Sequence, residues 1–128
     1  STLDRSSAAS DVYKRQGLAT THLVAPSTTP ERAATITAAC SGFVYAASTM
    51  GVTGARATVS HAAEQVVERI RAVSDLPIGL GLGVSSGEQA REVARYADGV
   101  IVGSALIQAA ADGNLGELAA ELARGVRA

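Results

Sequence analysis

The sequence predicts an α/β protein built from four successive strand–helix units. Four short apolar runs without Asp, Glu, Lys or Arg occupy residues 22–25, 42–47, 78–81 and 99–102, as expected for strands buried on both faces of a parallel sheet. Turns rich in Gly, Ser and Thr follow these runs, and helix signals lie between them. This alternation requires parallel strands that are joined by right-handed helical crossovers.

The helix starts carry specific capping signals. Thr29-Pro30 combines an N-cap residue with proline at the first helical position. The segments Ser85–Glu88 and Asn114–Glu117 have the spacing of a capping box. Ser60 is placed to cap a further helix, which ends before Asp75-Leu76-Pro77.

Two of these helices show an apolar face with helical periodicity. We expect the helix after Ser60 to bury Ala63, Val66, Val67, Ile70 and Val73. We expect the last helix to align Leu115, Leu118, Ala119, Leu122 and Val126 on one stripe.

Composition limits the class of protein. The 128 residues suffice for one domain, and 47% are hydrophobic and 18% charged, which is typical of globular proteins. A net charge of -1 without a basic cluster argues against nucleic-acid binding. No apolar run is long enough for a membrane span and no secretory signal is evident, so we expect a cytoplasmic protein. The single Cys40 excludes an internal disulfide, and we expect a buried, inert thiol.

The first sixteen residues differ from the rest of the chain. They mix small polar and charged residues without a strand or helix period. We interpret residues 1–16 as a disordered or foreign leader and residues 17–128 as the folded domain.

Four strand–helix units fit either an open doubly wound sheet or half of a closed (βα)8 barrel, and the glycines favour the barrel. Gly81-Leu82-Gly83 ends the third strand, and Gly103-Ser104 ends the fourth and opens directly into a helix. Glycine lets backbone amides approach phosphate oxygens, and a helix start favours an anion. Barrels commonly bind phosphate at their last two strands. The alternative is that these glycines only make tight turns and that Ser104 is a simple N-cap.

The remaining strand ends favour binding over proton transfer. Residues 48–56 form a long loop with two glycines, either a mobile lid or a plain solvated loop. Tyr45 fits a core aromatic better than a catalytic acid. No Asp, Glu, His, Lys or Cys stands directly at a strand end, and we expect His22 and His61 to be structural.

Three segments carry a family resemblance. The run 42–56, GFVYAASTMGVTGAR, resembles the sixth strand and lid loop of the tryptophan synthase alpha chain. LGLGVS at 80–85 and DGVIVGSA at 98–105 are similar to the ends of its seventh and eighth strands. The similarity extends from about Gly17 to the C-terminus.

The resemblance implies the C-terminal half, strands five to eight, of a (βα)8 TIM barrel. Such an enzyme cleaves indole-3-glycerol phosphate to indole and glyceraldehyde 3-phosphate in tryptophan biosynthesis, and it needs no cofactor or metal of its own. Its partner is a beta chain that carries pyridoxal phosphate, in an α2β2 tetramer. The positions that match phosphate-binding residues are Gly54, Gly83, Gly103 and Ser104. Those that match the substrate pocket and lid are Tyr45, Thr53, Leu82 and Ile101.

The sequence also departs from the family pattern. Leu82 replaces a phenylalanine, and Thr49-Met50 stand where an arginine and a small polar residue are common. The family's catalytic Glu and Asp belong to the first half of the barrel, so we expect the chain alone to be an inactive fragment. Two alternatives remain open: half of another phosphate-binding barrel, and a non-catalytic flavodoxin-like domain that binds a phosphorylated ligand or a partner protein.

Overall fold

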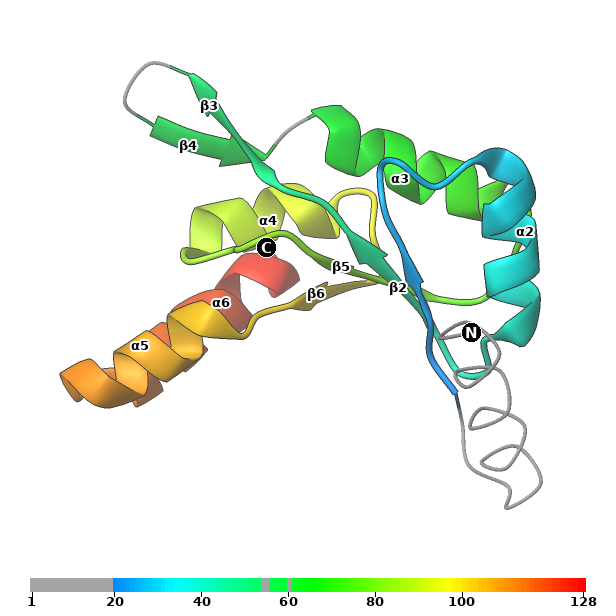
Figure 1. Cartoon of the computed structure of the whole chain (residues 1–128). Helices are drawn as coiled ribbons and strands as arrows, with labels where there is room; N and C mark the ends of the chain where they lie inside the picture. Colours follow the sequence, from blue (N-terminus) through cyan, green and yellow to red (C-terminus); the bar gives the residue numbers. More distant parts are fainter. Residues whose placement is uncertain (1–19, 54–55, 60) are drawn as a thin grey trace.

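A four-stranded parallel sheet with helices beside it forms the body of the molecule (Figure 1). The computed structural model describes residues 20–53, 56–59 and 61–128. The sheet contains β1 (Leu23–Val24), β2 (Val44–Ala47), β5 (Ile78–Gly81) and β6 (Gly99–Ile101), in the order β1-β2-β5-β6. The helices are α2 (Pro30–Ala39), α3 (His61–Arg71), α4 (Gly87–Ala94), α5 (Ser104–Asp112) and α6 (Leu115–Arg127). All four predicted parallel strands are therefore confirmed.

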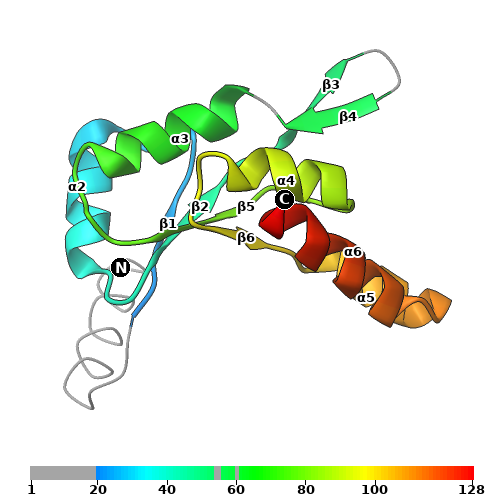
Figure 2. The ribbon, with the colours of Figure 1, turned by 180° about the vertical axis from the view of Figure 1, so that it is seen from behind.

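The strand order bears on the choice between barrel and doubly wound sheet. The strands lie in the sheet in their chain order, without the reversal that creates a switch point in doubly wound folds. Right-handed crossovers in one direction place their helices on a single face. Figures 1 and 2 show α2 and α3 beside β1 and β2, whereas α4 and α6 lie near β5 and β6. This arrangement is that of a barrel wall.

The helix-covered face of the sheet holds the core. Val24, Ala46 and Leu80 occupy one cross-strand row, and all three are fully buried. They join the buried residues of α3 and α4, which are Ala63, Val66, Val67, Ile70, Ala90 and Val93. The predicted face of α3 is confirmed except at Val73, which follows the helix and is exposed.

The opposite face of the sheet is only partly covered. Leu23, Tyr45 and Gly79 share a row on that face, and Phe43 precedes it. Leu23 and Phe43 are exposed, at 52% and 40%. The Ile101 side chain lies over Gly79 on this face, since a Cβ on Gly79 would be only 3.0 Å from it. This face corresponds to the inside of a barrel.

Two capping predictions can be compared with the observed caps. Thr29 caps α2 as predicted, since its hydroxyl accepts from the Arg32 amide at 3.2 Å and Pro30 is the first helical residue. The predicted Ser85 cap of α4 is wrong by one residue. Ser86 is the N-cap and accepts from the Gln89 amide, while the Gln89 side chain accepts from the Ser85 amide at 2.8 Å.

The expected loop at 48–56 is largely a hairpin. β3 (Met50–Thr53) and β4 (Arg56–Val59) pair antiparallel, with Met50 opposite Val59. The prediction of four strands therefore missed two, because glycines and hydroxyl side chains resemble loop composition. Gly54, the Ser60 cap and the proposed leader 1–16 lie outside the described residues.

The apolar stripe of α6 is mostly uncovered. The helix begins after Asn114 as predicted, but the Asn114 side chain makes no capping hydrogen bond. Of the predicted stripe only Leu122 is buried, whereas Leu115 and Val126 are more than 40% exposed. Periodicity correctly placed these residues on one face, and the structure leaves most of that face exposed.

Polar contacts fix the starts of β5 and β6. The Asp98 carboxylate accepts the Ile78 amide at 2.9 Å and lies 3.3 Å from the Arg71 guanidinium. The Asp98 amide in turn donates to the Ile78 carbonyl.

Cys40 was expected to be buried and is only partly so. It ends α2, and its sulfur accepts a hydrogen bond from the His22 amide at 3.3 Å.

Close backbone packing between α4 and α6 generates a stability prediction. A Cβ on Gly125 would overlap the carbonyl oxygen of Gly87, whereas a Cβ on Gly116 of the same helix would meet nothing within 4 Å. We expect Gly125→Ala to lower the free energy of unfolding by about 1–3 kcal/mol through overpacking. The matched control Gly116→Ala should leave it unchanged or raise it by up to about 1 kcal/mol. Thermal melts followed by circular dichroism measure both, and equal effects would contradict this packing.

The uncovered sheet face and edges generate a prediction about association. Among the described residues, β1 and β6 each pair with one strand only, and apolar side chains are exposed beside them. Unpaired edges and apolar patches favour association. We expect the 12.9 kDa chain to elute as dimers or larger species in size-exclusion chromatography with light scattering. A monodisperse monomer that unfolds cooperatively would argue instead for the complete open-sheet domain.

Candidate functional site

One pocket gathers most of the residues that the sequence predicted for a site. It lies at the C-terminal ends of β2, β5 and β6 and has a volume of about 270 Å³. Parallel strands end at the same edge of a sheet, so residues distant in sequence meet there. Six predicted residues line it, namely Tyr45, Leu82, Gly83, Ile101, Gly103 and Ser104, together with Ser48 and Gly81.

The wall of the pocket depends on a glycine under an aromatic ring. A Cβ on Gly81 would lie 2.6 Å from the Tyr45 hydroxyl and 3.0 Å from the adjacent ring carbon. Gly81 therefore lets the Tyr45 ring lie across the neighbouring strand and directs its hydroxyl toward the pocket. Ile101 follows in the same row, opposite Gly81, and Leu82 closes the wall with only 6% exposure.

Gly83 and Gly103 have different backbone conformations. Gly83 has a φ of +86°, which favours glycine for the turn itself. Gly103 has a φ of −125° and a ψ of −77°, a combination that is neither helical nor extended. A Cβ at either position would meet nothing within 4 Å. The backbone at both glycines therefore faces open space in the pocket, which is what close approach of a ligand to the main chain would require.

Helix α5 presents an unneutralised positive end to the pocket. Gly103 is its N-cap, and no side chain caps it, so the alternative that Ser104 is a simple N-cap is wrong. Each of the other described helices carries an acidic residue in its first turn (Glu31, Glu64, Glu88 and Glu117), and α5 has none. The amides and dipole at a helix start stabilise an anion. Among the described helices, α5 is the one whose positive end lacks an acidic side chain.

Ser48 is the first residue of the loop that the sequence predicts at 48–56. Its backbone amide donates to the Gly81 carbonyl at 3.0 Å and extends the pairing of β2 with β5. Its hydroxyl oxygen is buried and has no hydrogen-bond partner among the residues that the structure describes. No sequence pattern distinguishes this serine from exposed ones, because its burial arises from long-range pairing.

The lining residues determine what the pocket can do chemically. They supply backbone amides, hydroxyls and apolar surface, and among the described lining residues there is no Asp, Glu, His, Lys, Arg or Cys. Such a set binds and orients a ligand and lacks a carboxylate or imidazole for proton transfer. Thr53 ends β3, and the roles predicted for Thr53 and Gly54 stay predictions.

In the described part of the chain, the titratable groups away from the pocket do not form a second candidate site. Burial raises the pKa of Tyr96 to about 12, and the nearby carboxylates of Glu64 and Glu92 contribute. Tyr96 precedes β6 and lies toward the other end of the sheet from the pocket. His61 lies 3.7 Å from Glu64 on an exposed helix start. The described residues include no cluster of three or more His, Cys, Asp and Glu side chains suited to a metal ion, and no described helix is long and apolar enough to cross a membrane.

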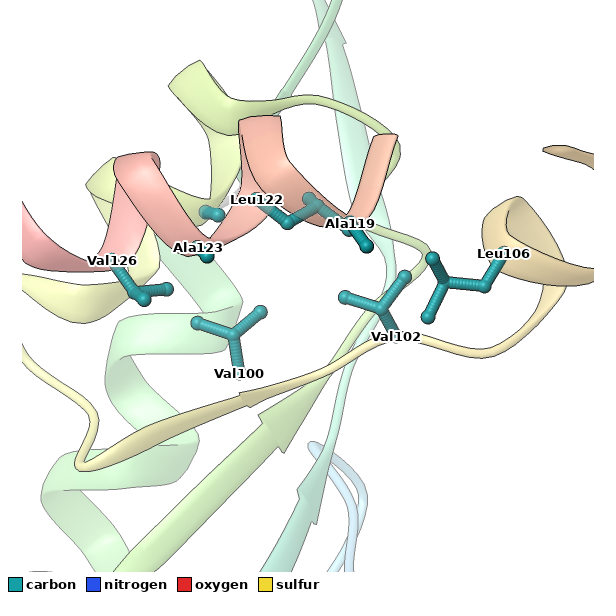
Figure 3. A pocket seen from close by; sticks show the side chains of 8 residues that line it. Val100, Val102, Leu106, Ala119, Leu122, Ala123 and Val126 are labelled. Atoms are coloured by element: carbon teal, nitrogen blue, oxygen red, sulfur yellow. The ribbon is translucent and has the colours of Figure 1, made fainter. Parts of the chain in front are cut away.

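A second pocket, of about 300 Å³, differs in chemistry. Figure 3 shows Val100 and Val102 facing Ala119 and Ala123 of α6 across it. Its other lining residues are Ala90, Leu106, Leu122 and Val126. Without polar side chains to orient a ligand, it is a packing gap on the outer face and not a candidate active site.

Comparison with known proteins identifies the family. The family model described as "Tryptophan synthase alpha chain" matches residues 3–125. The alpha chain of Mycobacterium ulcerans is 63% identical over 122 residues, which cover 94% of this chain and 44% of that protein. The alpha chain of Mycobacteroides abscessus is 64% identical over 107 residues, which cover 82% and 41%.

Solved structures agree with the sequence relatives. Tryptophan synthase of Mycobacterium tuberculosis matches with a TM-score of 0.85 and 53% identity, over 98% of this chain and 48% of that one. The tryptophan synthase a2b2 complex of Pyrococcus furiosus matches with a TM-score of 0.76 and 32% identity, over 88% and 48%. These matches confirm the predicted fold, strand–helix units of a (βα)8 barrel.

The chain spans less than half the length of the relatives and solved chains described above. Its match to the family nevertheless covers almost all of its own residues and includes every strand of the described structure and all of its helices except the last two residues of α6. The chain therefore belongs to the tryptophan synthase alpha chain family.

Proposed function

We propose that this chain supplies the phosphate-binding side of an active site that cleaves indole-3-glycerol phosphate to indole and glyceraldehyde 3-phosphate. Family membership supports this reaction, and the pocket supports the part played by these residues. Gly83, Gly103 and Ser104 would hold the phosphate, and Tyr45, Leu82 and Ile101 would contact the rest of the substrate.

The start of α5 is the observation that carries the proposal. A dianionic phosphate gains hydrogen bonds from main-chain amides and a favourable interaction with the helix dipole. The absence of an acidic residue in the first turn of α5 leaves both available for a ligand. Backbone donors are fixed by the fold, so they need little reorganisation when phosphate binds.

The proposed reaction involves a partner subunit. We infer that a tryptophan synthase beta chain with its own pyridoxal phosphate receives the indole, in an α2β2 assembly in the cytoplasm. The solved relative from Pyrococcus furiosus, described as an a2b2 complex, supports this partner. The alpha-type chemistry needs no cofactor in this chain. Thr53 and Gly54 complete the proposed site on the hairpin side.

A phosphate titration tests the binding role. In wild-type chain we expect weak, roughly millimolar binding of inorganic phosphate, with NMR shifts centred on residues 81–84 and 103–106. Gly103→Val should abolish binding, because a β-branched side chain would occupy the space that phosphate oxygens need. Ser104→Ala should only weaken it, because the amides of the helix start remain.

The matched control is Gly99→Val, at the start of the strand that leads to Gly103. A Cβ at Gly99 also meets nothing within 4 Å, but this residue lies at the start of β6, away from the pocket. It should leave phosphate binding unchanged. A folded wild-type chain without shifts at high millimolar phosphate, or with shifts elsewhere, would contradict the proposed site.

The lining residues also generate a prediction about turnover. Since the described lining residues include no carboxylate or imidazole, and each acid–base group typically contributes about 10²–10⁴-fold, we expect no detectable cleavage of indole-3-glycerol phosphate by the chain as printed. Coupled detection of glyceraldehyde 3-phosphate measures this. Turnover above that of a Gly83→Val, Gly103→Val double variant would overturn the expectation.

A further inference from the structure

The apolar gap between β6 and α6 lies at the edge of the described sheet. Elsewhere in the structure, a helix contacts both the strand before it and the strand after it, as α3 does with β2 and β5. Helix α6 follows β6, and no described strand comes after it. Val100 and Val102 therefore face Ala119 and Ala123 across an open gap of about 300 Å³ (Figure 3). The gap lies where the helix-facing side chains of a further strand would pack.

The inner face of the sheet is a second uncovered apolar surface. A Cβ on Gly79 would lie 3.0 Å from the Ile101 side chain and 3.5 Å from the Phe43 ring, so both side chains lie on this face. Leu23 and Tyr45 share the row of Gly79. None of these five residues is charged, and Leu23 and Phe43 are exposed. A partner that covers this face must be apolar there too, because a charge buried against it would lose its hydration without compensation.

A second copy of the chain supplies both missing surfaces. The chain spans less than half the length of its relatives and forms a barrel wall of four strands in chain order, whereas a (βα)8 barrel contains eight. A twofold axis along the barrel keeps all eight strands parallel and brings β6 of each copy beside β1 of the other. This closed arrangement pairs both edges, whereas contact through one edge leaves the other open. The net charge of -1 per chain adds little repulsion.

We propose that two copies of this chain close into one eight-stranded barrel with twofold symmetry. In it, β6 of each copy pairs in parallel with β1 of the other, and the helix-facing side chains of that β1 enter the gap between β6 and α6. The two inner faces, with Leu23 and Phe43, meet in the barrel interior, which side chains fill in a barrel of eight strands. The end of the second copy's β1 then lies beside Gly103 and Ser104, so each phosphate pocket gains a wall from the other copy.

Mass and intermolecular contacts test the closed dimer in the wild-type chain without ligand. Light scattering should give twice the 12.9 kDa of one chain and no larger species, because closure leaves no strand edge free. When labelled and unlabelled chains are mixed, isotope-filtered NMR should show contacts between methyl groups of β1 and of β6. Within one copy, three strand spacings of about 4.8 Å separate β1 from β6, so such contacts come from the second copy.

A matched pair of charged variants tests the inner face as the interface. Phe43 and Val73 are equally exposed, at 40% and 39%, but Phe43 lies on the inner face and Val73 follows α3 in the helix layer. Phe43→Lys would bury an unpaired charge from each copy and should raise the dissociation constant of the dimer at least about a hundredfold. Val73→Lys should change it less than about twofold. Circular dichroism checks that both variants keep the wild-type secondary structure.

The outcomes separate closure from other kinds of association. A monomeric wild-type chain would overturn the proposal and leave the uncovered surfaces to a different chain. Contacts of β1 with β1 or of β6 with β6, or species that keep growing with concentration, would also overturn it, because they indicate pairing that does not close. Equal effects of Phe43→Lys and Val73→Lys would show that the inner face is not the interface. If Phe43→Lys fails to fold, the mass and the contacts of the wild type still decide.

Closure goes beyond the proposed function and does not depend on it, because the dimer forms without phosphate. The phosphate titration is a separate measurement on the same chain. A closed dimer that binds no phosphate would contradict the proposed function and leave this inference standing. A monomer that binds phosphate at residues 81–84 and 103–106 would do the reverse.

Discussion

The parallel pairing of β2, β5 and β6 determines where every described residue of the pocket lies. Their register places Ala47, Gly81 and Ile101 in one row, and the chain leaves all three strands at the same edge. The Asp98 carboxylate fixes the other end of this ladder by accepting the Ile78 amide. A slip of one residue would exchange the two faces of a strand, and Tyr45 would then point into the helix layer.

Glycines let this ladder carry a site. Gly81 admits the Tyr45 ring, while Gly79 admits the Ile101 side chain. Both glycines lie on β5, the middle one of these three strands, where larger residues would occupy the space that Tyr45 and Ile101 take. β5 therefore places no side chain there, and the larger side chains, Tyr45 and Ile101, come from the neighbouring strands β2 and β6. Helix α5, directly after β6, then adds charge complementarity without any charged side chain.

Local sequence signals predicted what depends on local structure. Apolar runs gave the four parallel strands, and Thr29-Pro30 gave a helix start to the residue. Six of the predicted site residues share one pocket because strand ends in a parallel sheet converge. Features that depend on three-dimensional packing were missed. Both Ser85 and Ser86 fit a capping pattern, and only the path of the chain selects Ser86. The burial of Ser48 and the exposure of α6 likewise depend on neighbours that no periodicity identifies.

The composition of the pocket has a consequence for its response to acid. No described lining residue is a carboxylate, an imidazole or an amine, so protonation near neutral pH would not alter the protein side of the site. A phosphate monoester, by contrast, changes from dianion to monoanion near pH 6. Any acid dependence of binding would then follow the ionisation of the ligand itself. The affinity would then depend on the charge of the bound phosphate, because the described lining residues keep the same charge over this pH range.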